Sequence, residues 1–281
     1  MAENASSTPE FQARERIAMG HARVDRCSFE EAVSEITLRA LARRTTYVVT
    51  PNAQHLVLLN GNARFREIYD QADLVVAEGV SLVVAARMLG QRFPERVVGV
   101  NLFEARCRNA GWAGLRVFLL GGIPGSADAA AAVLRARCPD LQVETYCPPP
   151  GFQNGKLELA RVRKAIDAAR PDLLFVGFGA PKQEYWMCDH GRTLPAPVCM
   201  GVGGAFGMVA GVVPRAPNWI RRLGCEWLYR LHREPRRMWR RYLIGNPKFV
   251  WIVVRQALSR PPNGDSLPRP SARTASAGSL T

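Results

Sequence analysis

Short apolar runs of strand length alternate with longer amphipathic stretches along most of this chain. Ser28 and Glu31 form a capping-box pattern ahead of apolar residues at helical spacing. Strands are expected at residues 46–50, 74–77, 116–120 and 141–146, with two more inside 173–204, and helices at 81–89, 102–110 and 157–169. Five or six such β-α units predict an α/β fold in which a parallel sheet carries helices on both faces.

The alternation stops near Pro214, and the composition changes there. Residues 220–257 are basic, aromatic and helical in pattern, whereas the end of the chain is rich in Pro, Ser and Ala. The predicted organisation is a disordered N-terminus (1–20), an α/β domain (21–212), a basic helical appendage (213–260) and a disordered tail (261–281).

Positive charge is concentrated in the basic helical appendage, and this points to a function for it. The net charge is +14, and between Arg221 and Arg260 ten Arg and one Lys face only Glu226 and Glu234. An excess of this size indicates an anionic partner. Arginines interleaved with Trp and Tyr suit an anionic membrane surface, single-stranded nucleic acid or a solvated helical face, and the added apolar residues 252–254 favour the membrane.

Cysteine usage and hydropathy indicate the cellular compartment in which the protein is expected. The seven cysteines form no Cys-x-x-Cys pair, which is typical of reduced thiols in a cytosolic protein and predicts no zinc site. The N-terminus has no apolar signal core, and the apolar run at 249–254 is too short to span a bilayer.

Polar or glycine-rich turns follow five of the expected strands, and together they predict a nucleotide site. Each turn alone is more simply explained by turn geometry, and none is a full G-x-G-x-x-G motif. In a parallel sheet all five would meet at one edge, where glycine N–H groups and helix N-termini suit phosphate. The turns are Thr50-Pro51-Asn52, Glu78-Gly79, Gly121-Gly122, 177–183, and 201–204 with Gly203 and Gly204.

Three side chains are candidates for chemistry at this edge. Glu78 follows a buried strand, where burial would raise its pKa toward that of a general base; a helix-capping acid is the equal alternative. Arg96 would clamp a diphosphate or form a surface ion pair, and Gln183 would contact a sugar hydroxyl. His55 is expected to be structural. The histidines lack metal-ligand spacing and the chain lacks Asp-x-Asp, so we expect no metal and no cofactor.

Seven segments between residues 24 and 254 resemble the WecG/TagA/CpsF glycosyltransferase family, in order and at normal spacing. The PKQE, RAP and EWLYRL blocks are specific to it. The segments are TPNAQHLVLL, ADLVVAEGVSLVVAARMLG, PERVVG, RVFLLGGIPG, PDLLFVGFGAPKQE, GVGGAFGMVAGVVPRAP and EWLYRLHREPRRMWRRYL.

The resemblance implies a Rossmann-like catalytic domain and a membrane-associating appendage. The activity it implies is inverting and metal-independent transfer of a sugar from a nucleoside diphosphate, expected to be UDP, to a polyprenyl-diphosphate-linked acceptor in surface polysaccharide synthesis. Expected partners are the nucleotide sugar, the lipid-linked acceptor, an anionic membrane at its cytoplasmic face and, as an open question, a second copy of the chain; nucleic acid is not expected.

By position, the resemblance also assigns residues. Thr50 and Asn52 would line the donor pocket, and Arg96 and Gln183 would contact donor phosphate or sugar, beside the backbone of the glycine turns. Four arginines would face the acceptor diphosphate: Arg215, Arg230, Arg236 and Arg240.

Two positions depart from the family pattern. Glu78 replaces the aspartate proposed as the base, and Gly207 stands where an aspartate is usual. Three other classes stay open at this point: a nucleotide-dependent oxidoreductase, a basic nucleic-acid-binding module and an inactive family member.

Overall fold

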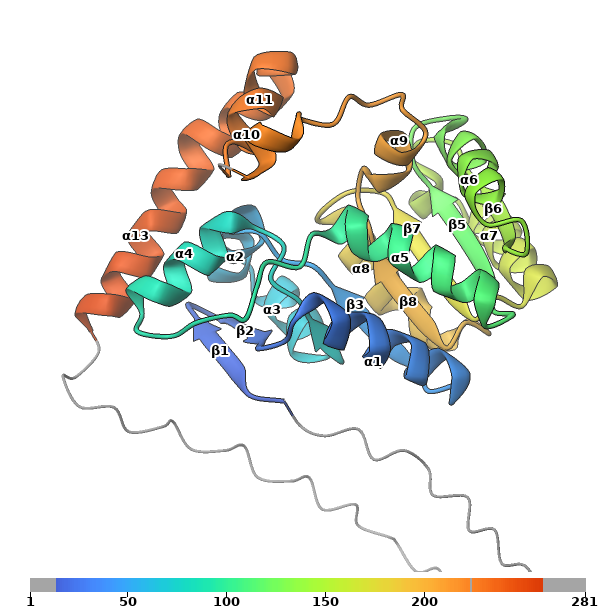
Figure 1. Ribbon diagram of the computed structural model, residues 1–281, viewed down its shortest axis with the longest axis horizontal. Coiled ribbons are helices and arrows are strands. Elements are labelled where there is room, and N and C mark those ends of the chain that lie inside the picture. The colour runs from blue at the N-terminus through green and yellow to red at the C-terminus, as the bar shows by residue number, and fades with distance from the viewer. Residues whose placement is uncertain (1–13, 223, 260–281) are drawn as a thin grey trace, which may run out of the picture.

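The protein is built around a six-stranded parallel sheet with the strand order β4-β3-β8-β7-β5-β6 (Figure 1). The computed structural model describes residues 14–222 and 224–259. The strands are short and buried, as the apolar runs predict. They are β3 (Thr46–Val49), β4 (Leu74–Val75), β5 (Arg116–Gly121), β6 (Gln142–Tyr146), β7 (Leu173–Gly177) and β8 (Val198–Gly201).

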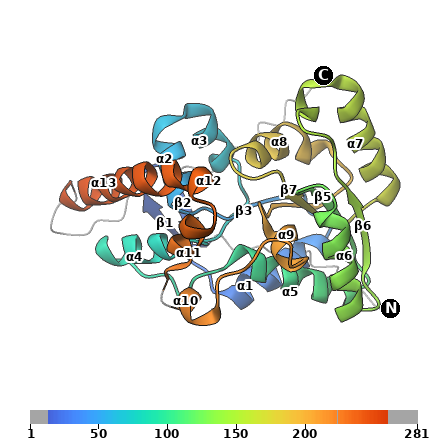
Figure 2. The ribbon, with the colours of Figure 1, turned by 90° about the horizontal axis from the view of Figure 1, so that it is seen from above.

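Helices cover both faces of the sheet and confirm the predicted fold class (Figure 2). Alternate residues of a strand enter opposite cores: Leu174 and Val176 of β7 face one, and Leu173 and Phe175 face the other. The first core packs on α2 (Ala53–Gly61), α3 (Ala63–Asp70), α4 (Val80–Met88), α7 (Lys156–Ala169) and α8 (Lys182–His190). The second packs on α1 (Phe29–Leu41), α5 (Gly99–Trp112), α6 (Ser126–Arg137) and α9 (Ala205–Val209). Two short 3-10 helices are η1 (Phe152–Asn154) and η2 (Gly191–Thr193).

An antiparallel hairpin precedes the sheet and corrects the predicted N-terminal boundary. It consists of β1 (Arg16–Met19) and β2 (Ala22–Asp25). Disorder as far as residue 20 is therefore wrong for β1, because Ile17 and Met19 alternate with solvent-facing positions and are fully buried. Residues 1–13 and 260–281, including the whole predicted tail, lie outside the described residues.

Beyond α9 the described chain continues as helices, as the pattern predicts. These are α10 (Asn218–Arg222), α11 (Glu226–Arg233), α12 (Pro235–Trp239), the π-helix η3 (Arg240–Ile244) and α13 (Gly245–Leu258). Phe249 and Val253 of α13 are buried in the first core. Gln256 donates to the carbonyl of Ala18 (3.0 Å) and accepts from the N–H of Gly20 (2.7 Å). The last helix therefore packs on the α/β body and its hairpin; the proposed boundary at residues 212/213 stays a prediction.

The topology places a switch point at the carboxyl ends of β5 and β7. The chain leaves β5 through α6 on the second-core face, and it leaves the neighbouring β7 through α8 on the first-core face. Where adjacent connections diverge in this way, an open α/β sheet forms its ligand crevice.

Candidate active site

Glu78 lies at the carboxyl end of β4, beside the turn that follows β3. Its backbone N–H donates to the carbonyl of Pro51 (3.1 Å). A Cβ added at Gly99, the first residue of α5, would stand 2.8 Å from Oε1 of Glu78 and 3.5 Å from Oγ1 of Thr50. The carboxyl group of Glu78, the hydroxyl group of Thr50 and the start of α5 therefore meet at one point, as predicted for two of these residues.

The electrostatic environment of Glu78 suits a proton acceptor. The side chain is half-buried, and no described residue donates a hydrogen bond to its carboxyl group. Burial raises the pKa of Glu78, whereas the neighbouring His55, Arg230 and Arg241 act in the opposite direction. A carboxylate with a raised pKa and no hydrogen-bond donor is free to take a proton from a substrate.

Asn52 shapes the turn between β3 and α2. It is the N-cap of α2: its side chain accepts from the N–H of Gln54 (3.1 Å), and its own N–H donates to Nδ1 of His55 (3.2 Å). This capping box satisfies N–H groups at the helix start. Asn52 lies at the predicted edge, but its side-chain oxygen is already used by the helix.

Gly121 and Gly122 form the turn after β5, and only glycine fits there. Both have φ near +90°, and added Cβ atoms would stand 2.5 Å from the Phe178 ring and from Oγ of Ser126. The N–H of Gly122 donates to the carbonyl of Gly177 (3.1 Å), which ties this turn to the end of β7. The two glycines therefore lie at the crevice, where the prediction put them.

The turn after β8 is held by Gln183 from α8. Oε1 of Gln183 accepts from the N–H groups of Gly203 (2.9 Å) and Gly179 (3.2 Å). Nε2 of Gln183 donates to Oε1 of Glu184 (2.8 Å), and the side chain is 5% exposed. Gln183 therefore reaches the predicted edge but bonds protein groups there. Gly204 follows as the N-cap of α9.

Arg215 and Arg96 form a cationic group near the start of α5. Arg215 donates to Asn101 and lies 3.8 Å from a carboxylate oxygen of Glu104. Burial lowers the pKa of Arg215, and the neighbouring charges of Arg221 and Arg96 lower it further. Like charges held this close together favour an anionic ligand.

The other predicted acceptor arginines divide into two kinds. Arg230 pairs with Glu226 (2.7 Å), touches Sδ of Met208 (3.7 Å) and acts on the pKa of Glu78. Arg236 and Arg240 are exposed, and Arg240 lies over the ring of its neighbour Trp239. The charge of Arg230 thus acts on Glu78, whereas the pKa of Glu78 shows no such effect of Arg236 or Arg240.

The sequence did not point to Glu184 or Arg241 as functional candidates, and His55 was expected to be structural. His55 and Glu184 are 4% and 1% exposed, and Nε2 of His55 lies 3.4 Å from Oε1 of Glu184. Glu184 stands in the PKQE block, which was a usable signal. Arg241 lies in the π-helix η3, which no sequence pattern indicated, and its charge acts on the pKa of Glu78.

Gly207 has a steric explanation. It lies buried in α9, and a Cβ there would stand 2.7 Å from a methyl group of Val213. The N–H of Val213 also donates to the carbonyl of Gly207 (2.8 Å). An aspartate at this position would therefore have to displace Val213.

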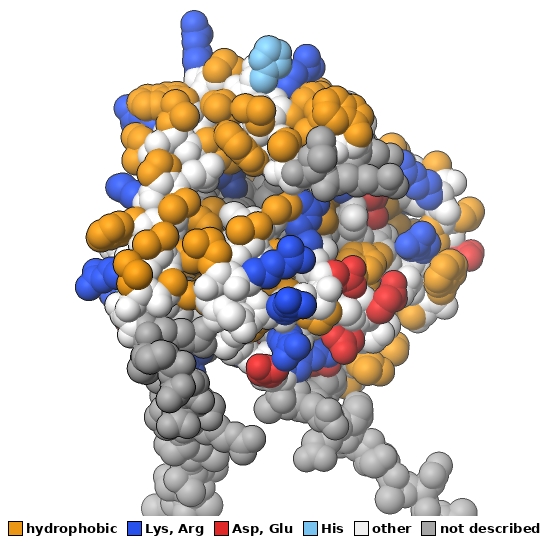
Figure 3. Space-filling model, turned by 60° about the vertical axis from the view of Figure 1, so that its left-hand side comes forward, with side chains coloured by type: hydrophobic (Ala, Val, Ile, Leu, Met, Phe, Trp, Pro, Cys, Tyr) orange, Lys and Arg blue, Asp and Glu red, His pale blue; other side chains and the backbone are white. Residues whose placement is uncertain are grey.

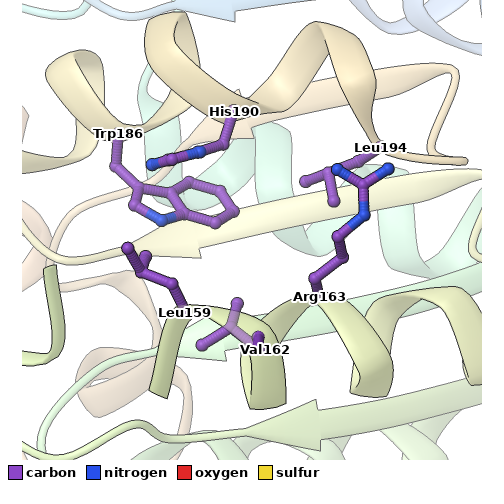
Figure 4. A pocket seen from close by; sticks show the side chains of 7 residues that line it. Leu159, Val162, Arg163, Trp186, His190 and Leu194 are labelled. Atoms are coloured by element: carbon purple, nitrogen blue, oxygen red, sulfur yellow. The ribbon is translucent and has the colours of Figure 1, made fainter. Parts of the chain in front are cut away.

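A cavity of about 180 Å³ lies elsewhere, between α7 and α8 (Figure 4). Figure 4 shows Trp186 and His190 of α8 facing Leu159 and Val162 of α7. None of the predicted site residues lines it. Its full lining is Leu159, Ala160, Val162, Arg163, Trp186, His190 and Leu194.

A parallel sheet with glycine turns, a desolvated carboxylate and arginines at its strand ends is the arrangement of α/β proteins that bind ligands in a strand-end crevice. Residues 17–263 match the Glycosyl transferase WecG/TagA/CpsF family, and the chain belongs to this family. It is a glycosyltransferase, which replaces the oxidoreductase and nucleic-acid-binding alternatives.

Curated relatives agree with this family. The chain is 33% identical over 209 residues to the N-acetylglucosaminyldiphosphoundecaprenol N-acetyl-beta-D-mannosaminyltransferase of Staphylococcus aureus strain MRSA252, a match that covers 74% of this chain and 80% of the relative. The protein of the same name from strain MW2 matches with the same identity and coverage.

Proposed function

We propose that the protein transfers a sugar from a UDP-sugar to a polyprenyl-diphosphate-linked saccharide, with inversion and without a metal ion. The observation that carries the proposal is the position of Glu78, a desolvated carboxyl group at the strand-end crevice beside Thr50 and the start of α5. The acceptor class follows from the names of the relatives, which act on a diphosphoundecaprenol-linked N-acetylglucosamine.

The proposed reaction is a single displacement. Glu78 takes the proton of the acceptor hydroxyl group, and that oxygen attacks the anomeric carbon of the donor from the face opposite the diphosphate. The bond from the anomeric carbon to the diphosphate oxygen breaks, and the nucleoside diphosphate leaves with the electron pair. One attack from the opposite face inverts the anomeric configuration.

Charge on the leaving diphosphate needs stabilisation. The N–H groups of Gly122 and Gly203 are already bonded to protein acceptors, so Gly121, Gly122 and Gly203 are proposed to let the diphosphate approach the backbone closely. The proposed donors are the N–H group of Gly204 at the start of α9 and nearby arginines, because preorganised donors and cations stabilise developing negative charge. Among the described residues, Arg96, Arg215 and Arg230 lie on this side of the molecule by their contacts and charge effects. Arg230 and Arg241, which act on Glu78, are the proposed contacts of the acceptor diphosphate.

A membrane-facing surface would bring the lipid-linked acceptor to this site. Figure 3 shows apolar side chains gathered with Lys and Arg around them. On α13, Trp251 is 66% exposed and Leu258 82% exposed, and Val84 and Met88 of the neighbouring α4 are about half exposed. No helix in the described ranges is long and apolar enough to cross a bilayer. We therefore propose peripheral contact with an anionic leaflet, where such surfaces bind.

The test is a donor screen. The full chain is incubated with anionic vesicles, a short-chain lipid-diphosphate N-acetylglucosamine acceptor and a panel of UDP- and GDP-sugars, with and without EDTA. Release of nucleoside diphosphate is followed, and reactions without acceptor are the control. The proposal expects acceptor-dependent release from a UDP-sugar that EDTA leaves unchanged.

Other results would refute separate parts of the proposal. Loss of release in EDTA would contradict metal independence, and release only from GDP-sugars would contradict the UDP assignment. Release that never depends on the lipid-linked acceptor would contradict the acceptor class.

A further inference from the structure

A buried chain of polar contacts runs beneath the candidate site and joins three turns. It starts at the N–H of Asn52, which donates to Nδ1 of His55 (3.2 Å), and it continues from Nε2 of His55 to Oε1 of Glu184 (3.4 Å). Gln183 donates to the same Oε1 (2.8 Å) and accepts from Gly179 and Gly203. We call these six residues the buried bridge.

The bridge spans three strands that are neighbours in the sheet. Asn52 follows β3, Gly203 follows β8 and Gly179 follows β7, in the spatial order β3-β8-β7. These are three of the five turns that form the candidate donor site. Side chains from only two helices, α2 and α8, therefore set the spacing of three backbone segments.

Burial makes the bridge costly to leave incomplete. Glu184 is 1% exposed, His55 4% and Gln183 5%. Buried polar groups without partners lose much more free energy than a surface hydrogen bond supplies. The hydroxyl group of Tyr47 in β3 also donates to the backbone carbonyl of Glu184 (3.3 Å), so α8 is tied to the central strands at two points.

The sequence also makes room for the bridge. A Cβ at Gly201, the last residue of β8, would stand 2.6 Å from Nε2 of Gln183. Glycine at this position lets the Gln183 amide pass between the ends of β7 and β8.

We propose that His55 and Glu184 are positioning residues of the transferase. Through Asn52 and Gln183 they hold the turns after β3, β7 and β8 at the spacing that donor binding requires, and neither touches substrate. The kinetic consequence of this inference rests on the proposed function. The geometry of the buried bridge is independent of it.

The geometry makes one spectroscopic prediction. Because Nδ1 of His55 accepts from the N–H of Asn52, the imidazole proton must lie on Nε2, facing Glu184. Long-range ¹H–¹⁵N spectra of the full chain, with the His55 signal assigned by His55→Gln, should show the Nε2–H tautomer. The Nδ1–H tautomer would overturn the bridge, whether or not the protein transfers a sugar.

A pair of variants tests the positioning role. Glu184→Gln keeps an oxygen where Oε1 accepts, so the bridge can persist without the charge. Glu184→Leu has similar volume but leaves His55 and Gln183 without their acceptor. Titration with UDP, and KM and kcat for the donor, are compared with wild type, and melting curves verify folding.

The expected result is a split between binding and turnover. Glu184→Leu should weaken UDP binding and raise the donor KM by about tenfold or more, with kcat within about threefold of wild type, because the buried Gln183 amide loses its acceptor and His55 loses its polar neighbour. Glu184→Gln should restore the UDP affinity and the donor KM to wild-type values. The proposal would be overturned if folded Glu184→Leu bound UDP with wild-type affinity. It would also be overturned if both variants lost kcat equally while the donor KM stayed unchanged.

If Glu184→Leu does not fold, the UDP affinity and donor KM of Glu184→Gln and the His55 tautomer of the wild type still test the proposal. A wild-type protein that binds UDP but transfers no sugar would refute the proposed function alone.

Discussion

Glu78 and Glu184 are two carboxylates at the same sheet edge, and their surroundings differ in every respect. Glu184 is 1% exposed, receives a hydrogen bond from Gln183 and lies 3.4 Å from His55. Glu78 is half-buried, receives no hydrogen bond from any described residue and has a pKa raised by burial. Oε1 of Glu184 is used by protein contacts and its Oε2 is buried without a hydrogen-bond partner among the described residues, whereas the carboxyl group of Glu78 is only half-buried and is left available to a substrate.

The difference separates two tasks at one edge. The β3–β8–β7 side is tied together by side chains that have little capacity for further partners, which suits a rigid binding frame. The β4 side presents a carboxyl group that the protein desolvates without partnering, which suits proton transfer.

Glu78→Gln should have the largest effect. If Glu78 is the base, turnover falls roughly 10²- to 10⁴-fold, because the amide cannot accept the proton. Acceptor-dependent release of nucleoside diphosphate measures it. Glu78→Asp, which restores the aspartate usual in the family, is the matched control and should keep much of the activity. Near-normal turnover in Glu78→Gln would remove Glu78 from the chemistry.

Gln183→Leu should instead act on stability. The change leaves the N–H groups of Gly179 and Gly203 without their acceptor and Glu184 without a donor, so we expect a loss of roughly 2–4 kcal/mol in the free energy of unfolding. Urea unfolding measures it. Lys182→Ala, at the exposed neighbouring position, should change stability by less than about 0.5 kcal/mol. Equal effects from the two variants would mean that Gln183 is not a structural bridge.

Gly99→Ala tests how closely Glu78 is fitted. The added Cβ would stand 2.8 Å from Oε1, so the carboxyl group must move aside. A displacement of about 1 Å at a reacting group can reduce the rate about 10- to 100-fold. Gly61→Ala is the control, since a Cβ there meets nothing within 4 Å. Equal kcat values in the two variants would show that the position of Glu78 is not critical.

Arg241→Gln should produce the smallest change, a shift in pH dependence. A carboxylate base works in its ionised form, so the rate rises with pH through the pKa of Glu78 and then levels off. Because burial raises the pKa of Glu78, this rise in rate should occur at a pH above the ordinary glutamate pKa of about 4.3. Because Arg241 lowers the pKa of Glu78, its removal should move the rise to higher pH and leave the plateau unchanged. A shift to lower pH would contradict the assignment.

The α/β fold was predictable because each strand carries a local signal. Residues buried on both faces give continuous apolar runs, and the helices between them carry their own periodicity. The hairpin at β1 was missed because four residues such as Arg16–Met19 are too short to show alternation against a polar background. Its burial depends on α13, more than 200 residues later in the chain.

The candidate site was predictable only in part. Strand-end position located Glu78, Thr50 and the glycine turns, because parallel topology gathers all such positions at one edge. Sequence could not show that Gln183 turns inward or that His55 meets Glu184, since 129 positions separate His55 from Glu184 and only the tertiary structure brings them together. The division of labour between the two carboxylates is therefore a property of tertiary structure.

A structure with UDP bound would show whether the donor binds at the strand ends beside Glu78. We expect the diphosphate at the glycine turns after β5 and β8, on the side of the Arg96 and Arg215 guanidinium groups, with room for the sugar beside the Glu78 carboxyl group. UDP bound in the cavity between α7 and α8, or at any site away from these turns, would contradict it.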